Sequence, residues 1–237
     1  AQLYPQVSSR PIGLASGLSG YHAFQRRPTY MKLAHLSLAD RAREMAKPEI
    51  KAAIMSETDV LVDQPGSMAN MYQLFQTAAM FLYPLADPVD YEPDPSEMLG
   101  SRAAATGQDV LDLLYDYMLE QDGAAMCALM GGPNVHDSQE VLRKMLIHSE
   151  TVTGLSDAGA HVTLICDATM PTTQLTFWAR DRHKGERLPL EFLVAKQTAR
   201  NADLYGLNDR GRLAVGLRAD INVIDFENLR VSPPKAF

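Results

Sequence analysis

The sequence predicts an α/β fold in which strands and helices alternate, as in the closing part of a (β/α) barrel. Three observations predict this fold class. Residues 3–14 are typical of a strand that runs into a loop rich in proline and glycine, and the β-branched run 151–153 is typical of a second strand. Helical apolar periodicity lies between these two strands, at 109–123 and 138–146. Strand, loop, helix, strand and helix in this order fit a barrel of parallel strands.

The helices are predicted from their first residues. Each predicted start is either a side chain that caps a helix or a proline that suits a first turn, and these residues are Ser37, Pro48, Asp109, Ser138, Pro171 and Pro189. Residues 60–95 hold five prolines and little periodicity, which indicates an insertion. This insertion is either a lid over the barrel mouth or a plain surface excursion, and long ordered loops are more often functional. The charged segment 181–187 is expected to be a solvated turn with local ion pairs.

Composition excludes several classes of function. The 237 residues carry a net charge of -7, which does not favour nucleic acid as a partner. No apolar run reaches the roughly 20 residues that cross a bilayer, so no membrane partner is expected. Cys127 and Cys166 make no disulfide framework, and each is expected to be a small buried side chain. A reducing, cytoplasmic location is the prediction. Composition predicts no oligomeric state.

The segment Gly-Leu-Ser-Asp-Ala-Gly-Ala-His at 154–161 directly follows the second predicted strand. It places the carboxylate of Asp157 where a buried strand ends, which in a barrel of parallel strands is the catalytic rim. A carboxylate at such a place can move protons in hydrolysis. An aspartate after a strand also commonly caps the next helix or forms a turn. The residues alone leave both interpretations open.

A second pattern, Gly-x4-Gly-x2-Ala-Asp-x4-Asp, lies at 211–225. Together with residues 154–161 it resembles the end of an amidohydrolase-superfamily enzyme of the D-aminoacylase (N-acyl-D-amino-acid deacylase) branch. The resemblance implies the C-terminal part of a TIM-like (β/α)8 metal-dependent hydrolase barrel plus a return strand of a small β-sandwich. It implies that residues 1–209 belong to the barrel, with the insertion at about 60–95, and that 210–237 belong to the sandwich. It also implies that Asp157 ends the eighth barrel strand, binds a catalytic metal and acts as general acid and base.

The same resemblance implies zinc-dependent hydrolysis of a non-peptide amide bond, with one or two divalent ions and a small acylated amine or amino acid as substrate. The superfamily's His-x-His metal pair does not occur among the six histidines of this sequence. Because the chain also begins without methionine, it is expected to be a C-terminal fragment, inactive alone, with most metal ligands elsewhere in the parent protein. N-acyl-D-amino acids are the expected substrates.

Two further residues are candidates for substrate binding. Arg10 lies at the catalytic end of the first predicted strand, where a guanidinium could bind a substrate carboxylate. His161 either contacts the substrate or packs against the rim as a buried histidine. The resemblance is imperfect here, since typical D-aminoacylases have an arginine soon after the catalytic aspartate. In this sequence none occurs between Asp157 and Arg180, which indicates a divergent subgroup.

Two other functions compete with the deacylase. A cyclic amidase of the dihydroorotase or hydantoinase kind belongs to the same superfamily, but its closing-strand context differs from residues 154–161. A non-catalytic barrel remnant that serves assembly or binding is favoured by the missing His-x-His pair. The presence of Asp157 argues against the remnant for the parent protein.

Overall fold

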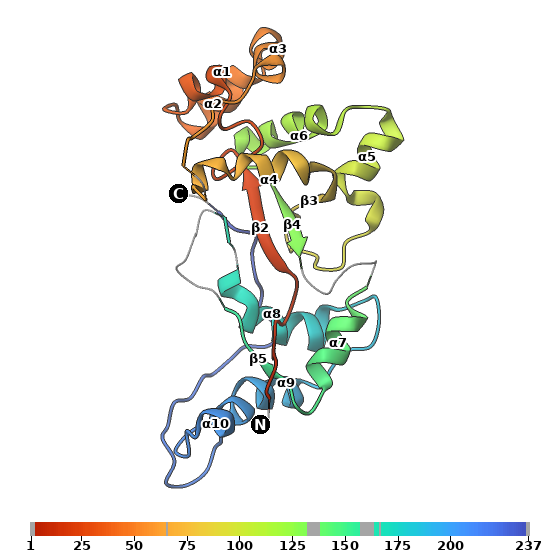
Figure 1. The fold of residues 1–237 in the computed structure, drawn as a ribbon. Helices are drawn as coiled ribbons and strands as arrows, with labels where there is room; N and C mark the ends of the chain where they lie inside the picture. The colour runs from red at the N-terminus through yellow and green to blue at the C-terminus, as the bar shows by residue number, and fades with distance from the viewer. Residues whose placement is uncertain (1–2, 65, 132–137, 157–163, 166, 236–237) are drawn as a thin grey trace. The chain divides into compact units, whose positions relative to one another are not determined.

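The structure is a computed structural model that describes residues 3–64, 66–131, 138–156, 164–165 and 167–235 (Figure 1). The chain divides into two compact units. The first unit comprises residues 1–12, 131–160 and 167–232, and the second comprises 13–130, 161–166 and 233–237. Helices and a few short strands make up both units, as an α/β fold requires.

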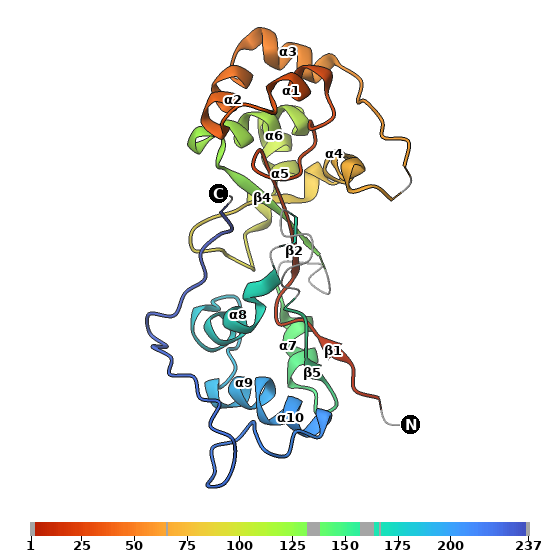
Figure 2. The same ribbon diagram turned by 90° about the vertical axis from the view of Figure 1, so that its left-hand side faces the viewer.

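The first unit is built on two parallel strands. Strand β1 (Gln6–Val7) pairs with β5 (Val152–Thr153), so that Gln6 lies opposite Val152 and Val7 opposite Thr153. Figure 2 shows these two strands side by side. The helices of this unit are α7 (Glu140–Ile147), α8 (Met170–Thr176), α9 (Leu190–Gln197) and α10 (Ala199–Tyr205), and α8 continues into a π-helical turn at Phe177–Asp181. Strands distant in sequence are thus direct parallel neighbours, as the sequence predicts.

A small apolar core holds the first unit together. Trp178 is its largest fully buried side chain, and Val7 and Val152 from the two strands are buried as well. Helices α7 and α9 contribute the buried side chains of Leu146 and Leu193. Burial of an apolar side chain of this size contributes about 1.5–3 kcal/mol, so packing on the strand pair stabilises these short helices.

The second unit contains a three-stranded sheet in the order β2, β4, β3. Strand β3 (Leu82–Pro84) runs antiparallel to β4 (Met126–Gly131), and β2 spans Ile12–Gly17. The helices are α1 (Pro28–Leu33), α2 (Leu38–Met45), α3 (Pro48–Ser56), α4 (Tyr72–Thr77), α5 (Leu99–Thr106) and α6 (Val110–Leu119). Short 3-10 helices lie at Met68–Asn70, Ala79–Phe81, Pro95–Glu97 and Gln121–Gly123 in this unit, and at Asp167–Thr169 in the first.

The core of the second unit explains why its segments fold together. Phe24, Phe75 and Tyr115 are buried in one cluster with Met45 from α2, and the rings of Phe24 and Tyr115 meet edge to face. Cys127 of β4 belongs to the same cluster, as expected for a small buried side chain, and burial raises the pKa of its thiol. Cys166 lies outside the described residues.

The predicted helix starts are confirmed to within two residues. The Ser37 side chain accepts a hydrogen bond from the Asp40 N–H at the start of α2, and Asp109 accepts two at the start of α6. Pro48 is the first residue of α3, and Pro189 directly precedes α9. Signals of this kind are reliable because a cap acts within one turn of its own position.

The structure of residues 60–95 and of residues 210–235 differs from what the sequence indicates. Residues 60–95 are not wholly irregular, since they supply α4, β3 and the buried Phe75 and Leu82. Among the described residues 210–235 no strand is formed, so the expected return strand is not observed there. Val215 and Val223 are fully exposed, and no neighbouring strand covers them in the described part of the chain. A strand needs such a partner for its backbone groups, and the barrel and sandwich assignments remain predictions.

Arg180 holds part of this C-terminal stretch. Its guanidinium donates hydrogen bonds to the carbonyl oxygens of Phe226, Glu227 and Leu229, and it lies over the Phe226 ring. None of the helices in the described ranges is long and apolar enough to cross a membrane.

Candidate active site

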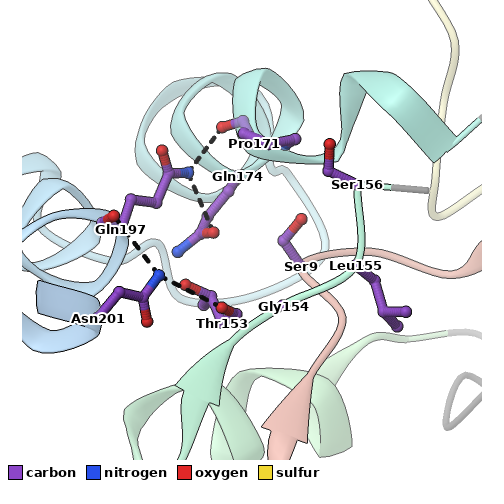
Figure 3. A pocket seen from close by; sticks show the side chains of 9 residues that line it. All are labelled: Ser9, Thr153, Gly154, Leu155, Ser156, Pro171, Gln174, Gln197 and Asn201. Carbon is purple, nitrogen blue, oxygen red and sulfur yellow. Dashed lines mark hydrogen bonds between the residues drawn. The ribbon is translucent and has the colours of Figure 1, made fainter. Parts of the chain in front are cut away.

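A pocket of about 240 Å³ opens in the first unit where β1 and β5 end (Figure 3). It is lined by residues at or just after the ends of the two strands and by residues of three helices: Ser9, Thr153, Gly154, Leu155, Ser156, Pro171, Gln174, Gln197 and Asn201. The carboxyl ends of parallel strands are where α/β proteins place ligands. This pocket is therefore the candidate active-site region of the described chain.

Lysine contacts fix the start of strand β5. The buried Lys196 donates from Nζ to the carbonyl oxygen of Thr151 at 2.6 Å, to the Thr151 hydroxyl at 2.9 Å and to the His148 carbonyl oxygen at 3.2 Å. Burial, and then the positive charge of Arg200, lower the pKa of Lys196. The lysine thus anchors the segment from which β5 leads into the pocket.

Ser9 is held from both sides at the end of β1. Its hydroxyl donates to the Met170 carbonyl oxygen at 2.8 Å, and its own carbonyl oxygen accepts the indole N–H of Trp178 at 2.6 Å. Both partners belong to the helical segment that begins with α8. These contacts attach the end of β1 to the helix that forms one wall of the pocket.

Gly154 directly follows β5 and is held against the end of β1. Its N–H donates to the Val7 carbonyl oxygen at 3.1 Å, and a Cβ atom at this position would meet the Gln6 side-chain oxygen at 3.0 Å. The next residue, Leu155, has a φ of 65°, which is rare for a residue with a branched side chain. Strained backbone of this kind is concentrated at functional sites.

The predicted catalytic residue comes next in the sequence. Ser156 is the last described residue of this segment, and Asp157 and His161 lie outside the described residues. Their catalytic, metal-binding and substrate-binding roles therefore remain predictions. The structure describes β5 and residues 154–156, which precede Asp157.

Arg10 lies just past β1 and is fully buried. Its Nη1 atom lies 3.0 Å from Oδ1 of Asp167 and also donates to the Pro11 carbonyl oxygen, while Nη2 donates to the Thr169 hydroxyl. The guanidinium in this structure thus contacts a carboxylate of the chain itself. Its role in binding a substrate carboxylate remains a prediction.

Three carboxamides dominate the polar lining, and the sequence analysis did not identify them. Gln174 comes from α8, Gln197 from α9 and Asn201 from α10. Figure 3 shows them grouped on one side of the pocket, with Ser9 and Leu155 on the other. Gln197 and Asn201 lie only four residues apart in the sequence, but on two different helices. The contribution of Gln174 follows only from the fold.

The described residues do not by themselves form a metal site. Within the described ranges no group of three or more His, Cys, Asp or Glu side chains is arranged to hold an ion. A catalytic zinc site commonly needs three protein ligands. The described residues alone therefore do not supply the ligands of such an ion.

Comparison with known proteins identifies the family. The family model described as "Amidohydrolase family" matches residues 6–237, nearly the whole chain. The chain belongs to the amidohydrolase family. The parallel strands β1 and β5, with the pocket at their carboxyl ends, agree with part of an amidohydrolase barrel.

A curated relative refines this placement. An N-acyl-D-glutamate deacylase of Alcaligenes xylosoxydans xylosoxydans is 52% identical over 46 residues, which are 19% of this amidohydrolase chain and 9% of the relative. The predicted resemblance to the D-aminoacylase branch is thereby confirmed. No solved structure matches the chain significantly.

Proposed function

We propose that the parent protein is a metal-dependent hydrolase of a non-peptide amide bond, acting on N-acyl-D-amino acids. Zinc is the proposed metal, and it would supply an activated water in the intact enzyme. The observation that carries the proposal is the position of the pocket at the carboxyl ends of β1 and β5. One of its lining residues, Ser156, directly precedes Asp157 in the sequence. Family membership supports the reaction class.

Asp157 is the residue of this chain to which we assign the proton transfers. Its carboxylate would accept a proton from the attacking water and then deliver it to the departing amine. We also propose it as this chain's contribution to the metal ligands. Lys196 and the β1 backbone make contacts that fix β5. These contacts would keep the Asp157 carboxylate close to the amide bond that is hydrolysed.

The remaining assignments are proposals of the same kind. Arg10 would bind the α-carboxylate of the substrate. For this role, the Arg10 guanidinium must bind the substrate carboxylate while it keeps its contact to Asp167. His161 would contact the acyl group or pack at the rim of the barrel. The fold that we propose is a TIM-like barrel with a composite β-sandwich to which residues 210–237 contribute.

The substrate class is proposed from the relative's name, which specifies an N-acyl-D-glutamate. A direct test supplies the zinc-loaded full-length protein with N-acetyl derivatives of several D-amino acids and their L-enantiomers, and measures release of the free amino acid. We expect turnover of the D-series alone. Turnover of dihydrouracil or hydantoin in place of every N-acetyl amino acid would instead support the cyclic amidase. No turnover of any of these amides would contradict the proposal.

A further inference from the structure

Lys196 on α9 is a buried cation that no carboxylate neutralises in the described part of the chain. The residue is 6% exposed, and its ammonium group donates hydrogen bonds to neutral oxygen atoms. A buried charge without a counterion is unfavourable, because the loss of hydration is not offset. Burial, and then the charge of Arg200, accordingly lower the pKa of Lys196. An apolar side chain would fill the same space without this disadvantage, so the charge needs an explanation.

The hydrogen bonds of Lys196 require the charged form. Nζ donates to both oxygen atoms of Thr151 and to the carbonyl oxygen of His148. An ammonium group has three protons, one for each acceptor, whereas a neutral amine has two. His148 directly follows α7, and the free carbonyl groups at the end of a helix favour a cation. The charge therefore joins the end of α7 to the residue that precedes β5.

The same lysine also contacts the last residue of β5. The Thr153 hydroxyl donates to the Lys196 carbonyl oxygen at 3.4 Å, and α9 lies beside β5 in both ribbon views (Figures 1 and 2). Strand β1 holds β5 through the backbone, since the Val152 N–H donates to the Pro5 carbonyl oxygen at 3.0 Å. One residue of α9 thus fixes β5 at its beginning and at its end.

A shift of β5 would be passed on to Asp157. The Gly154 N–H still donates to the Val7 carbonyl oxygen of β1, and only two residues separate Gly154 from Asp157 in the sequence. A displacement of about 1 Å at reacting groups can lower a rate about 10²-fold. The position of β5 along β1 is therefore a property on which the proposed proton transfers depend.

We propose that Lys196 is a positioning residue: its ammonium charge holds β5 where the Asp157 carboxylate reaches the amide bond that is hydrolysed. The proposal rests on the proposed deacylase function. The ammonium group contacts the residue before β5, whereas the pocket lies where β5 ends. Lys196 therefore affects the rate of the chemical step and leaves substrate binding unchanged.

Two substitutions in the zinc-loaded full-length protein test the role of the charge. Lys196→Met keeps an unbranched side chain but removes the charge and the donors, whereas Lys196→Arg keeps both. We expect Lys196→Met to lower kcat about 10–100-fold with KM within about threefold, and Lys196→Arg to lower kcat less than about fivefold. Lys32→Met, at an exposed lysine of the second unit, is the control and should keep wild-type kinetics. A folded Lys196→Met variant with the wild-type kcat would overturn the proposal.

Hydrogen exchange measures the hold on β5 without any substrate. In Lys196→Met the amides of Val152 and Gly154, which donate to β1, should exchange about tenfold faster or more, with an unchanged melting temperature. Unchanged exchange of both amides would contradict the proposal. Faster exchange throughout the first unit, together with a lower melting temperature, would show a merely structural role and would also overturn it.

The two measurements separate this proposal from the proposed function. If the wild type hydrolyses no amide but Lys196→Met loosens β5, the deacylase function is refuted and the hold of Lys196 on β5 is supported. If the wild type hydrolyses N-acetyl-D-amino acids and Lys196→Met equals it in kcat and in exchange, the positioning role alone is refuted. A Lys196→Met variant that does not fold is replaced by Lys196→Gln, which keeps a donor without the charge and for which the same fall in kcat is expected.

Discussion

The guanidinium of Arg10 and the carboxylate of Asp167 form a buried ion pair, with Nη1 and Oδ1 3.0 Å apart and both side chains at most 3% exposed. The two residues are separated by 157 positions in the sequence. Arg10 follows β1, whereas Asp167 begins the short helix that leads into α8. The pair therefore connects the segments that form opposite walls of the candidate active site.

Loss of the carboxylate in Asp167→Asn is expected to lower the free energy of unfolding by about 3–5 kcal/mol. The reason is that the substitution removes a carboxylate that lies 3.0 Å from the buried Arg10 guanidinium. Urea unfolding of the full-length protein measures this loss. The matched control is Asp181→Asn in the half-exposed pair with Arg180, for which less than about 1 kcal/mol is expected.

A double variant, Arg10→Met with Asp167→Leu, tests whether the buried charge of Arg10 causes this loss of stability. Because buried ion pairs are often replaceable by apolar residues of similar volume, we expect it to be more stable than Asp167→Asn. An Asp167→Asn variant as stable as the wild type would show that the pair does not support this part of the fold.

Arg10→Lys tests whether the same guanidinium also binds substrate. Lysine keeps the positive charge near Asp167 but cannot make the planar, two-point contact of a guanidinium with a carboxylate. We expect KM to rise by a larger factor than kcat falls. The wild-type protein supplies the comparison, assayed with substrates that carry either an α-carboxylate or an α-carboxamide. Equal kinetics on these two substrates would contradict a role for Arg10 in binding the substrate carboxylate.

His22 is expected to make the second unit sensitive to acid. Its ring is fully buried against Tyr30, and Nδ1 accepts the Phe24 N–H at 3.2 Å. Burial, and then the charge of Arg41, lower the pKa of His22 from 6.5 to about 3. Between these values the unfolded chain binds a proton that the folded chain does not. The free energy of unfolding therefore falls as the pH drops, by about 1.4 kcal/mol per pH unit.

His22→Asn retains a hydrogen-bond acceptor for Phe24 but does not titrate. Between pH 6.5 and pH 5 the wild type should lose about 2 kcal/mol more than this variant in urea unfolding. The exposed His35 provides the control, since His35→Asn should keep the wild-type pH dependence. Identical pH dependence of the wild type and His22→Asn would contradict the assignment.

Local signals in the sequence predicted the parts of the fold that depend on neighbouring residues. The Ser37 and Asp109 caps, and the β-branched run that becomes β5, are of this kind. The sheet of β2, β4 and β3 was not predicted, because β3 pairs with residues about 45 positions later along the chain. Strand β3 also lies in the segment 60–95, whose prolines indicate a loop.

The candidate site shows the same division. The β-branched run before Asp157 was predicted as a strand, and the structure has β5 there. The partners of Arg10 and the carboxamide lining depend on contacts over more than 20 residues, which one sequence does not reveal. The prediction of a solvated turn at 181–187 was wrong for Arg182, which is 1% exposed. Its guanidinium lies over the Trp178 ring and donates to the Glu186 carbonyl oxygen.

The most direct test of the central claim is the kcat of Asp157→Asn in the zinc-loaded full-length protein, measured on its best N-acetyl-D-amino acid. The exposed Asp122→Asn serves as the control. The amide has nearly the volume of the carboxylate but cannot accept the proton, so we predict an unchanged melting temperature and a kcat about 10²–10⁴-fold lower. Asp122→Asn should retain full activity. Retention of most of the wild-type kcat by a folded Asp157→Asn variant would contradict the account.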